Sequence, residues 1–164
     1  MATSKLTTVS LALNGVLLVV LAMLWSGRDS AVLAFLDKRS ERTLSFFDSF
    51  PVASRDVVFL GDSMTEAGLW SEIFPAVSPK NRGRGGDTVA LLAGRLDQVI
   101  SGHPRAIFLQ IGTNDLTHGP RDREVSYQEY REIIERIQSE SPATRIHVQS
   151  LLPRGSKFRE DIQA

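Results

Sequence analysis

The sequence predicts an α/β fold with a parallel β-sheet, because strand-like and helix-like segments alternate through its second half. Short apolar runs at 57–60, 106–111 and 145–152 have the length and composition of buried strands. Between them, apolar residues recur at helical spacing over 88–101 and 126–139. Alternation of this kind is typical of a parallel sheet that is covered by helices on both faces.

The ends of these elements carry their own signals. Gly102 follows the helical pattern of 88–101 as a stop signal. Ser126 and Glu129 have the spacing of a capping box, which predicts that the next helix begins at Ser126. Pro142 ends that helix, and residues 156–164 have the pattern of the first turns of another one.

Length and composition limit the classes of protein that the chain can belong to. Its 164 residues are 42% hydrophobic and 23% charged, which indicates a globular domain. The formal net charge is zero, so we expect no nucleic-acid partner. Cysteine is absent, which excludes disulfide scaffolds, thiolate zinc sites and cysteine nucleophiles.

The N-terminal segment differs in character from the rest. Leu6–Trp25 is uncharged and long enough to cross a bilayer, which takes roughly 20 apolar residues. We therefore predict a transmembrane anchor within residues 1–30, an amphipathic juxtamembrane segment at 31–54 that Pro51 ends, and a globular domain at 55–164. A cleaved signal peptide with the core Gly15–Trp25 is the main alternative, although small residues are missing at the expected cleavage site. A buried helix is a third interpretation.

Three short motifs lie where predicted strands end or helices begin. The first is Gly61-Asp62-Ser63, directly after the strand at 57–60. The carboxyl ends of parallel strands are where α/β proteins bind ligands, so Ser63 is a candidate nucleophile. Thr65 stands where a nucleophile elbow has its second glycine, so this is not an ordinary α/β-hydrolase signature. The alternative is that Ser63 caps a helix.

The second motif is the glycine-rich segment 81–88, which precedes the helix at 88–101. Its glycines allow a close approach of the backbone to a ligand, and N–H groups at a helix start stabilise negative charge. The segment lacks a preceding strand in the sequence pattern and is neither a dinucleotide fingerprint nor a phosphate loop. The alternative is a turn with Asp87 or Thr88 as the helix cap.

The third motif, Gly112-Thr113-Asn114-Asp115, ends the strand at 106–111. The side-chain amide of Asn114 would point toward the same sheet edge as Ser63. An amide donor at that edge can stabilise the oxyanion of an acyl-transfer reaction. A turn asparagine is the alternative interpretation.

In this order, the motifs GDS, GGDT and GTND resemble the first three conserved blocks of the SGNH (GDSL-type) hydrolases, over residues 57–153. The resemblance implies a flavodoxin-like three-layer α/β/α sandwich and hydrolysis of small esters, of lipid acyl or acetylated-sugar type, without a cofactor. It implies that Ser63 is the nucleophile and that its own N–H is one oxyanion donor. Gly86 would add a second donor through its backbone, and Asn114 a third through its side chain.

The base is the missing part of this pattern. The family's fourth block, Asp-x-x-His, supplies it and lies beyond the last residue of this sequence, so we expect a C-terminally truncated domain. His103 and His147 do not match the block. Asp115 and His118 match its letters, but they overlap the third block, which favours an ordinary loop histidine. The last strand would then be an exposed edge that favours self-association.

The leading hypothesis is a single-pass membrane esterase with its domain outside the cytoplasm, or a secreted or periplasmic one if the signal is cleaved. Because the base is missing from the pattern, the sequence leaves open whether this chain is active. Two alternatives remain beside the esterase hypothesis. One is a noncatalytic module that binds an acylated glycan or another anion through the loop at 82–88. The other is an inert truncated fragment.

Overall fold

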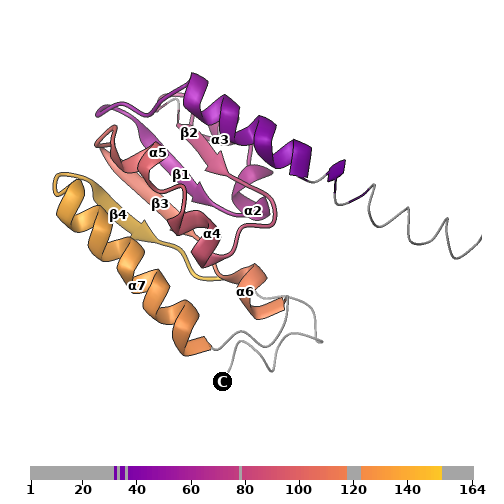
Figure 1. Ribbon diagram of the computed structural model, residues 1–164. Helices are drawn as coiled ribbons and strands as arrows, with labels where there is room; N and C mark the ends of the chain where they lie inside the picture. Colours follow the sequence, from indigo (N-terminus) through magenta and orange to yellow (C-terminus); the bar gives the residue numbers. More distant parts are fainter. Residues whose placement is uncertain (1–31, 33, 36, 78, 118–122, 153–164) are drawn as a thin grey trace, which may run out of the picture. The chain divides into compact units, whose positions relative to one another are not determined.

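The computed structural model describes residues 32, 34–35, 37–77, 79–117 and 123–152 (Figure 1). The chain divides into two compact units, Met1–Arg42 and Thr43–Ala164. A helix covers residues 37–49, and the chain leaves it just before Pro51, as the sequence predicts. The second unit contains all the remaining elements and is described below.

Four parallel strands form the sheet, in the order β2-β1-β3-β4 (Figure 1). They are β1 (Val57–Gly61), β2 (Lys80–Gly83), β3 (Ala106–Gln110) and β4 (Arg145–Val148). This order equals the first four positions of the doubly wound order 2-1-3-4-5. The predicted parallel α/β fold is confirmed, and the carboxyl ends of all four strands meet at one edge.

Helices connect successive strands in pairs. These are α2 (Ser63–Glu66) and α3 (Trp70–Ile73), then α4 (Val89–Ala93) and α5 (Asp97–Ile100), then α6 (Thr113–Thr117) and α7 (Arg123–Glu140). The predicted helix at 126–139 corresponds to α7, but the capping box is wrong, because α7 begins three residues before Ser126. The Ser126 hydroxyl donates instead to Asp115 Oδ1 at 3.4 Å.

β2 is absent from the sequence prediction, which treated its residues as part of a loop. The segment Lys80–Gly83 is polar, so it has no apolar run to mark it as a strand. Its place in the sheet comes from backbone pairing with β1 and from close packing at Gly83, where a Cβ would lie 2.1 Å from the Glu66 nitrogen. Arg82 is buried, with its guanidinium 4.7 Å from the centre of the Phe47 ring.

The helix predicted over 88–101 is divided into α4 and α5 by a turn at 94–96. Tight bonds of the i to i−3 kind hold this turn, from Leu96 N to Ala93 O at 3.3 Å and from Gln98 N to Arg95 O at 3.2 Å. The predicted apolar face is nevertheless fully buried, and its members are Val89, Leu92, Leu96, Val99 and Ile100.

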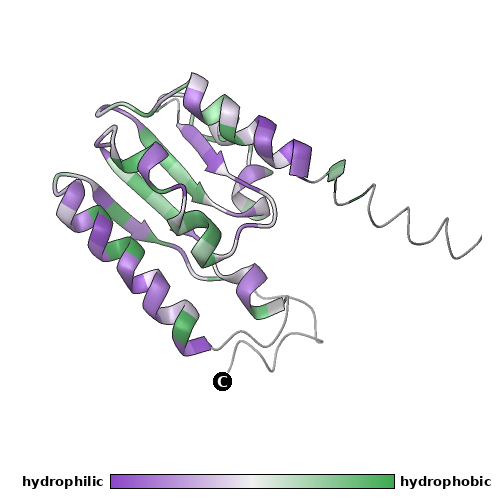
Figure 2. Cartoon of the chain, in the orientation of Figure 1, coloured by the Kyte–Doolittle hydropathy of each residue, from purple (hydrophilic) through white to green (hydrophobic). Residues whose placement is uncertain are grey.

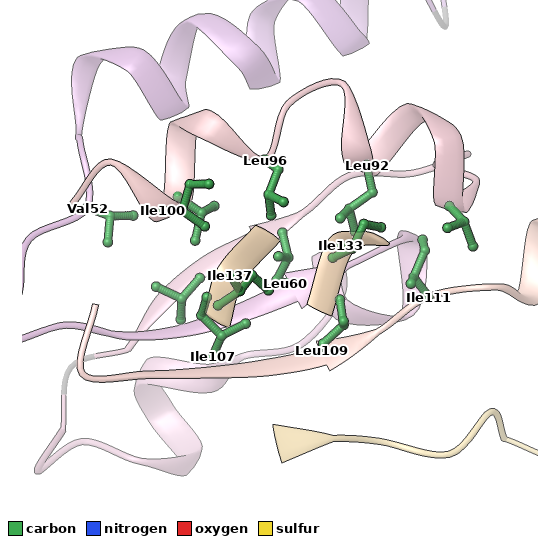
Figure 3. Packing of buried hydrophobic residues seen from close by; sticks show 13 residues of the cluster. Val52, Leu60, Leu92, Leu96, Ile100, Ile107, Leu109, Ile111, Ile133 and Ile137 are labelled. Carbon is green, nitrogen blue, oxygen red and sulfur yellow. The ribbon is translucent and has the colours of Figure 1, made fainter. Parts of the chain in front are cut away.

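The two faces of the sheet are covered unequally. One face packs against α4, α5 and α7, and Figure 3 shows the leucine and isoleucine side chains of this cluster meeting between the helices and the strands. The other face carries aromatic side chains and is covered by α3, whose Trp70 ring stacks on Phe59 at 4.0 Å. Figure 2 shows the apolar stripe along β1 and β3, in contrast with the polar β2.

The third predicted strand, 145–152, is shorter in the structure and ends at Val148. Within the part of the chain described here, β4 pairs with β3 alone and forms one edge of the sheet. No helix among the described residues is long and apolar enough to cross a membrane. The predicted anchor at Leu6–Trp25 and the predicted helix at 156–164 lie outside the described residues.

Candidate active site

Ser63 is the first residue of α2, directly beyond the carboxyl end of β1. Asp62 is the N-cap of this helix, since its Oδ1 accepts a hydrogen bond from Met64 N at 2.9 Å and its side chain is buried. The alternative in which Ser63 caps the helix is therefore wrong. The Ser63 side chain is exposed at the sheet edge, where a substrate could reach it.

The glycine-rich loop lies beside Ser63. Arg84 N donates to Gly61 O at 3.0 Å, and Asp87 N donates to Arg84 O at 3.3 Å, which closes a tight turn. Gly86 has a φ of +84° in this turn, a conformation that favours glycine, and the space around its Cα is open. A Cβ on Gly85 would lie 3.9 Å from the Cβ of Ser63.

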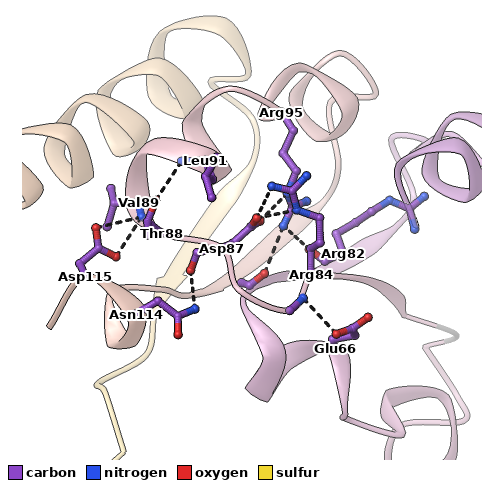
Figure 4. A network of polar contacts seen from close by, with 12 residues as sticks. Glu66, Arg82, Arg84, Asp87, Thr88, Val89, Leu91, Arg95, Asn114 and Asp115 are labelled. Carbon is purple, nitrogen blue, oxygen red and sulfur yellow. Dashed lines mark hydrogen bonds and ion pairs between the residues drawn. The ribbon is translucent and has the colours of Figure 1, made fainter. Parts of the chain in front are cut away.

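Asn114 lies in α6, beyond the carboxyl end of β3, and is buried. Its side-chain nitrogen donates to the backbone carbonyl of Asp87 at 2.7 Å, as Figure 4 shows. The loop that approaches Ser63 at Gly85 is thus bonded to Asn114 at Asp87, with Gly86 between them. The structure thus places the three predicted residues beyond the carboxyl ends of three neighbouring strands, β1, β2 and β3.

A buried ion-pair network holds this loop in place. The Asp87 carboxylate is completely buried and lies 2.5 Å from Arg84 and 2.7 Å from Arg95 (Figure 4). Burial lowers the pKa of the Arg95 guanidinium, and the neighbouring Asp87 carboxylate opposes that change. The sequence analysis missed Arg95. Its position in the sequence could have indicated burial, because Arg95 is three residues after Leu92 and four before Val99, on the apolar face of the predicted helix.

Asp115 and Glu66 make two further contacts that the sequence analysis did not predict. The Asp115 carboxylate accepts hydrogen bonds from Val89 N at 3.3 and 3.0 Å, which ties α6 to the start of α4. Thr88 is the N-cap of α4, which is one of the two caps that the alternative interpretation of segment 81–88 names, and its hydroxyl accepts from Leu91 N at 3.3 Å. Glu66 Oε2 accepts from Gly85 N at 3.0 Å and so places a carboxylate next to the glycine turn.

The arginines of the loop are engaged inside the protein. Arg84 bonds Asp87, and Arg82 donates to the carbonyl oxygens of Asn81 and Phe50 while its guanidinium lies over the Phe47 ring. These side chains are therefore not directed at an external ligand. The noncatalytic alternative depends on the backbone N–H groups of the loop, which these bonds do not test.

The two histidines that the structure describes lie away from Ser63. His103 precedes β3, at the amino ends of the parallel strands, and contacts the Ser141 hydroxyl at 3.3 Å. His147 lies in β4, separated from β1 by β3, and its ring stacks on Phe108 at 4.5 Å. His118 falls outside the described residues. In the described ranges, no cluster of acidic or histidine side chains could hold a metal ion.

An apolar cavity of about 370 Å³ lies beyond the carboxyl ends of β3 and β4. Its wall includes Asp115 and Gly112, the neighbours of the Asn114 segment. Tyr130 also lines this wall, and burial raises the pKa of its phenol. The other apolar and aromatic residues of the wall are Val89, Ile111, Leu116, Tyr127, Val148 and Leu151.

Comparison with known proteins identifies similar chains. The platelet-activating factor acetylhydrolase IB subunit alpha1 of Bos taurus is 32% identical over 124 residues, which are 70% of this chain and 52% of the relative. The human subunit alpha2 is 34% identical over 108 residues, 62% of this chain and 46% of the relative. The chain thus spans about half the length of these curated relatives.

Solved structures agree with this similarity. A structure from Streptococcus pneumonia that carries the name of platelet activating factor superposes with a TM-score of 0.66 at 26% identity, over 82% of this chain and 65% of that chain. A GDSL-like lipase from Bacteroides thetaiotaomicron, with a TM-score of 0.61 at 20% identity over 76% and 64% of the two chains, shows the same fold. The model of the GDSL-like lipase/acylhydrolase family matches residues 59–164. The chain belongs to the GDSL-like lipase/acylhydrolase family.

Proposed function

We propose that this chain is a serine esterase that cleaves small carboxylic esters at the edge formed by β1, β2 and β3. Ser63 is the nucleophile in this proposal. Its own N–H, the Gly86 N–H and the Asn114 amide are the oxyanion donors. The hydrogen bond from Asn114 to the Asp87 carbonyl is the observation that supports the proposal best, because it ties the third motif to the second at the place where the second approaches Ser63.

The chemistry proceeds through an acyl-enzyme. The Ser63 oxygen attacks the ester carbonyl carbon, and the carbonyl electron pair moves onto the oxygen that the three donors hold. Collapse of this oxyanion expels the alcohol and leaves the acyl group on Ser63, which water then hydrolyses. In comparable sites one such donor lowers the barrier by about 2.7–4 kcal/mol. The Ser63 proton requires a base, a role that we assign to no residue in the described ranges.

We infer that the acyl or alcohol part of the substrate is short and apolar. The cavity of about 370 Å³ beside the Asn114 segment supports this inference, since its wall is mostly aliphatic and aromatic. The relatives are named as acetylhydrolases, which agrees with a short acyl group. Esters of lipids and of acetylated sugars are the candidate substrates.

The test combines a covalent probe with turnover. The protein is incubated with a fluorophosphonate probe and, separately, with p-nitrophenyl esters of two to eight acyl carbons. The variant Ser63→Ala is compared with Ser71→Ala, which removes another exposed hydroxyl from α3. We expect that Ser63→Ala alone loses labelling and hydrolysis. Equal labelling of the two variants would contradict the nucleophile assignment, and retention of acylated glycans without labelling would favour a binding module.

We also propose that Leu6–Trp25 anchors the chain in a membrane with the catalytic unit outside the cytoplasm. The proposal is supported by the length and lack of charge of this run. Carbonate extraction of membranes should leave the full chain in the pellet and release a variant that lacks residues 1–30. Release of both proteins by carbonate would contradict an anchor and favour cleavage of a signal peptide.

A further inference from the structure

The Arg95 side chain contacts both of the strands that precede Ser63 and the glycine turn. It lies in the turn between α4 and α5, and its Nη2 donates to Gly61 O at 3.1 Å and to Arg82 O at 3.0 Å. These carbonyls lie at the carboxyl ends of β1 and β2, just before Ser63 and just before the glycine turn. The guanidinium thus links the carboxyl ends of β1 and β2 by hydrogen bonds to both.

The same guanidinium also holds Asp87. Its Nε donates to Asp87 Oδ2 at 2.7 Å, whereas Arg84 contacts the other oxygen, Oδ1 (Figure 4). Arg95 and Asp87 are 6% and 0% exposed, so this pair is shielded from the screening that weakens surface ion pairs. The planar guanidinium of arginine suits this position, because its several N–H donors can bond one carboxylate and two carbonyl oxygens at the same time.

Asp87 transmits this restraint to the two oxyanion donors. Its carbonyl accepts the Asn114 amide at 2.7 Å, and its nitrogen closes the turn that contains Gly86 at a φ of +84°. A shift of the Asp87 backbone would therefore move the Gly86 N–H and the Asn114 amide together. Arg95 itself contacts neither donor.

We propose that Arg95 is a positioning residue for the oxyanion hole, acting through Asp87 on Gly86 and Asn114. The inference rests on the esterase function proposed above and extends it. Arg95 fixes how the hole is aligned with Ser63, in addition to any contribution that it makes to folding. Misplacement of reacting groups by about 1 Å can lower a rate roughly 100-fold, so the effect on turnover is large even though Arg95 does not touch the substrate.

The chain offers a matched control in Arg82. Both arginines are buried, both lie over the Phe47 ring at 4.7 and 5.5 Å, and burial lowers the pKa of both. The Arg82 side chain donates to the carbonyls of Asn81 and Phe50, and neither of these hydrogen bonds involves Asp87. A role in stability is therefore common to both residues, and a role in alignment is expected of Arg95 alone.

The kinetic test compares Arg95→Met with Arg82→Met on p-nitrophenyl acetate. We expect Arg95→Met to lower kcat about 100-fold with little change in KM, as for an interaction that acts in the transition state. Arg82→Met should retain kcat within about twofold in its folded fraction, which thermal unfolding defines. An equal loss of kcat in both variants would overturn the proposal.

A second variant addresses the case in which Arg95→Met does not fold. Arg95→Lys retains a cation beside Asp87 but cannot bond both strand carbonyls and the carboxylate as the guanidinium does. We expect kcat of this variant to fall between those of the wild type and Arg95→Met. A kcat equal to that of the wild type would overturn the proposal.

A third measurement does not depend on turnover. In ¹⁵N-labelled protein, the Gly86 N–H and the Asn114 side-chain NH₂ give resonances that Gly86→Ala and Asn114→Ala identify. We expect Arg95→Lys to move both resonances and to raise the hydrogen-exchange rate of Gly86, whereas Arg82→Met leaves both near their wild-type positions. Unmoved resonances in Arg95→Lys would overturn the positioning role. If the wild type hydrolyses no ester while the resonances move as expected, the proposed function fails and the positioning role stands.

Discussion

The part of the sheet formed by β2, β1 and β3 and the flank formed by β4 are built by different means. At the carboxyl ends of β1 and β2, buried charges and backbone carbonyls are bonded to one another, and Asp87 and Arg95 are almost wholly enclosed. Along β4 most side chains are exposed, and Val148 is 57% exposed although it follows the same parallel register. Buried ionic and hydrogen bonds are thus concentrated beside the segments that carry Ser63, Gly86 and Asn114.

This difference indicates which part of the sheet positions the candidate catalytic residues. The three candidate residues follow β1, β2 and β3, and none of them follows β4. The flank contributes Val148, Gln149 and Leu151 to the apolar cavity, so its expected role is in substrate fit. Substitutions in the two regions should therefore affect different measurements, and the following predictions test this from the largest expected effect to the smallest.

Asn114→Ala should have the largest effect, because it removes a proposed oxyanion donor and the bond to the Asp87 carbonyl. We expect kcat on p-nitrophenyl acetate to fall about 10²–10³-fold. The control is Gln110→Ala, which removes a bond of 3.1 Å from β3 to Ser150 on the flank. This control should change kcat less than about threefold. Comparable losses from both substitutions would break the distinction between the two regions.

Ile107→Ala and Ile146→Ala test the same comparison through stability. The two isoleucines are register partners on β3 and β4, but Ile107 is completely buried whereas Ile146 is half-buried at the flank. We expect Ile107→Ala to lower the free energy of unfolding by about 2–5 kcal/mol. Ile146→Ala should cost clearly less, because its cavity opens to water. Urea denaturation measures both, and equal costs would show that the flank is packed as tightly as the centre.

The sequence predicts well those helices and strands that an apolar pattern marks. The strands β1 and β3 and the helix α7 each have a hydrophobic run or stripe of the right period, and their ends agree with the structure within a few residues. The motif residues Ser63, Gly86 and Asn114 lie at strand ends as expected, since parallel strands place their carboxyl ends at one edge.

The features that the sequence does not predict are held by polar contacts, most of them between residues far apart in the chain. β2 pairs through its backbone and buries Arg82 against Phe47, a contact between residues far apart in the sequence that no local pattern contains. The turn at 94–96 that divides the predicted helix contains Arg95, which bonds Asp87 and two strand carbonyls. Asp62, rather than Ser63, caps α2, which local preference could not decide because both residue types are good caps.

The free edge of β4 should allow self-association, which we propose as the chain's behaviour at high concentration. Within the described residues β4 has one strand partner, and unpaired backbone groups at an edge can pair with a second chain. Val148→Lys should lower the dimer fraction in sedimentation equilibrium several-fold by placing a charge at this edge. Val125→Lys, which alters an exposed valine of α7, should leave it unchanged. A wild type that is monomeric at all concentrations would contradict the proposal.

Substitution of Arg136 should have the smallest effect, on the free energy of unfolding, although this residue makes more ion pairs than Arg95. Its guanidinium lies 2.6 Å from Asp97 and 2.8 Å from Glu140, and these carboxylates raise its pKa. All three side chains are largely exposed, so water and salt screen the attraction. Arg136→Ala should therefore lower the free energy of unfolding by about 0–1 kcal/mol, and less still in 1 M salt. The buried pair of Arg95 and Asp87 differs in that it should be nearly insensitive to salt. A salt-insensitive loss at Arg136 would mean that contacts of its aliphatic stem, and not charge, account for its contribution.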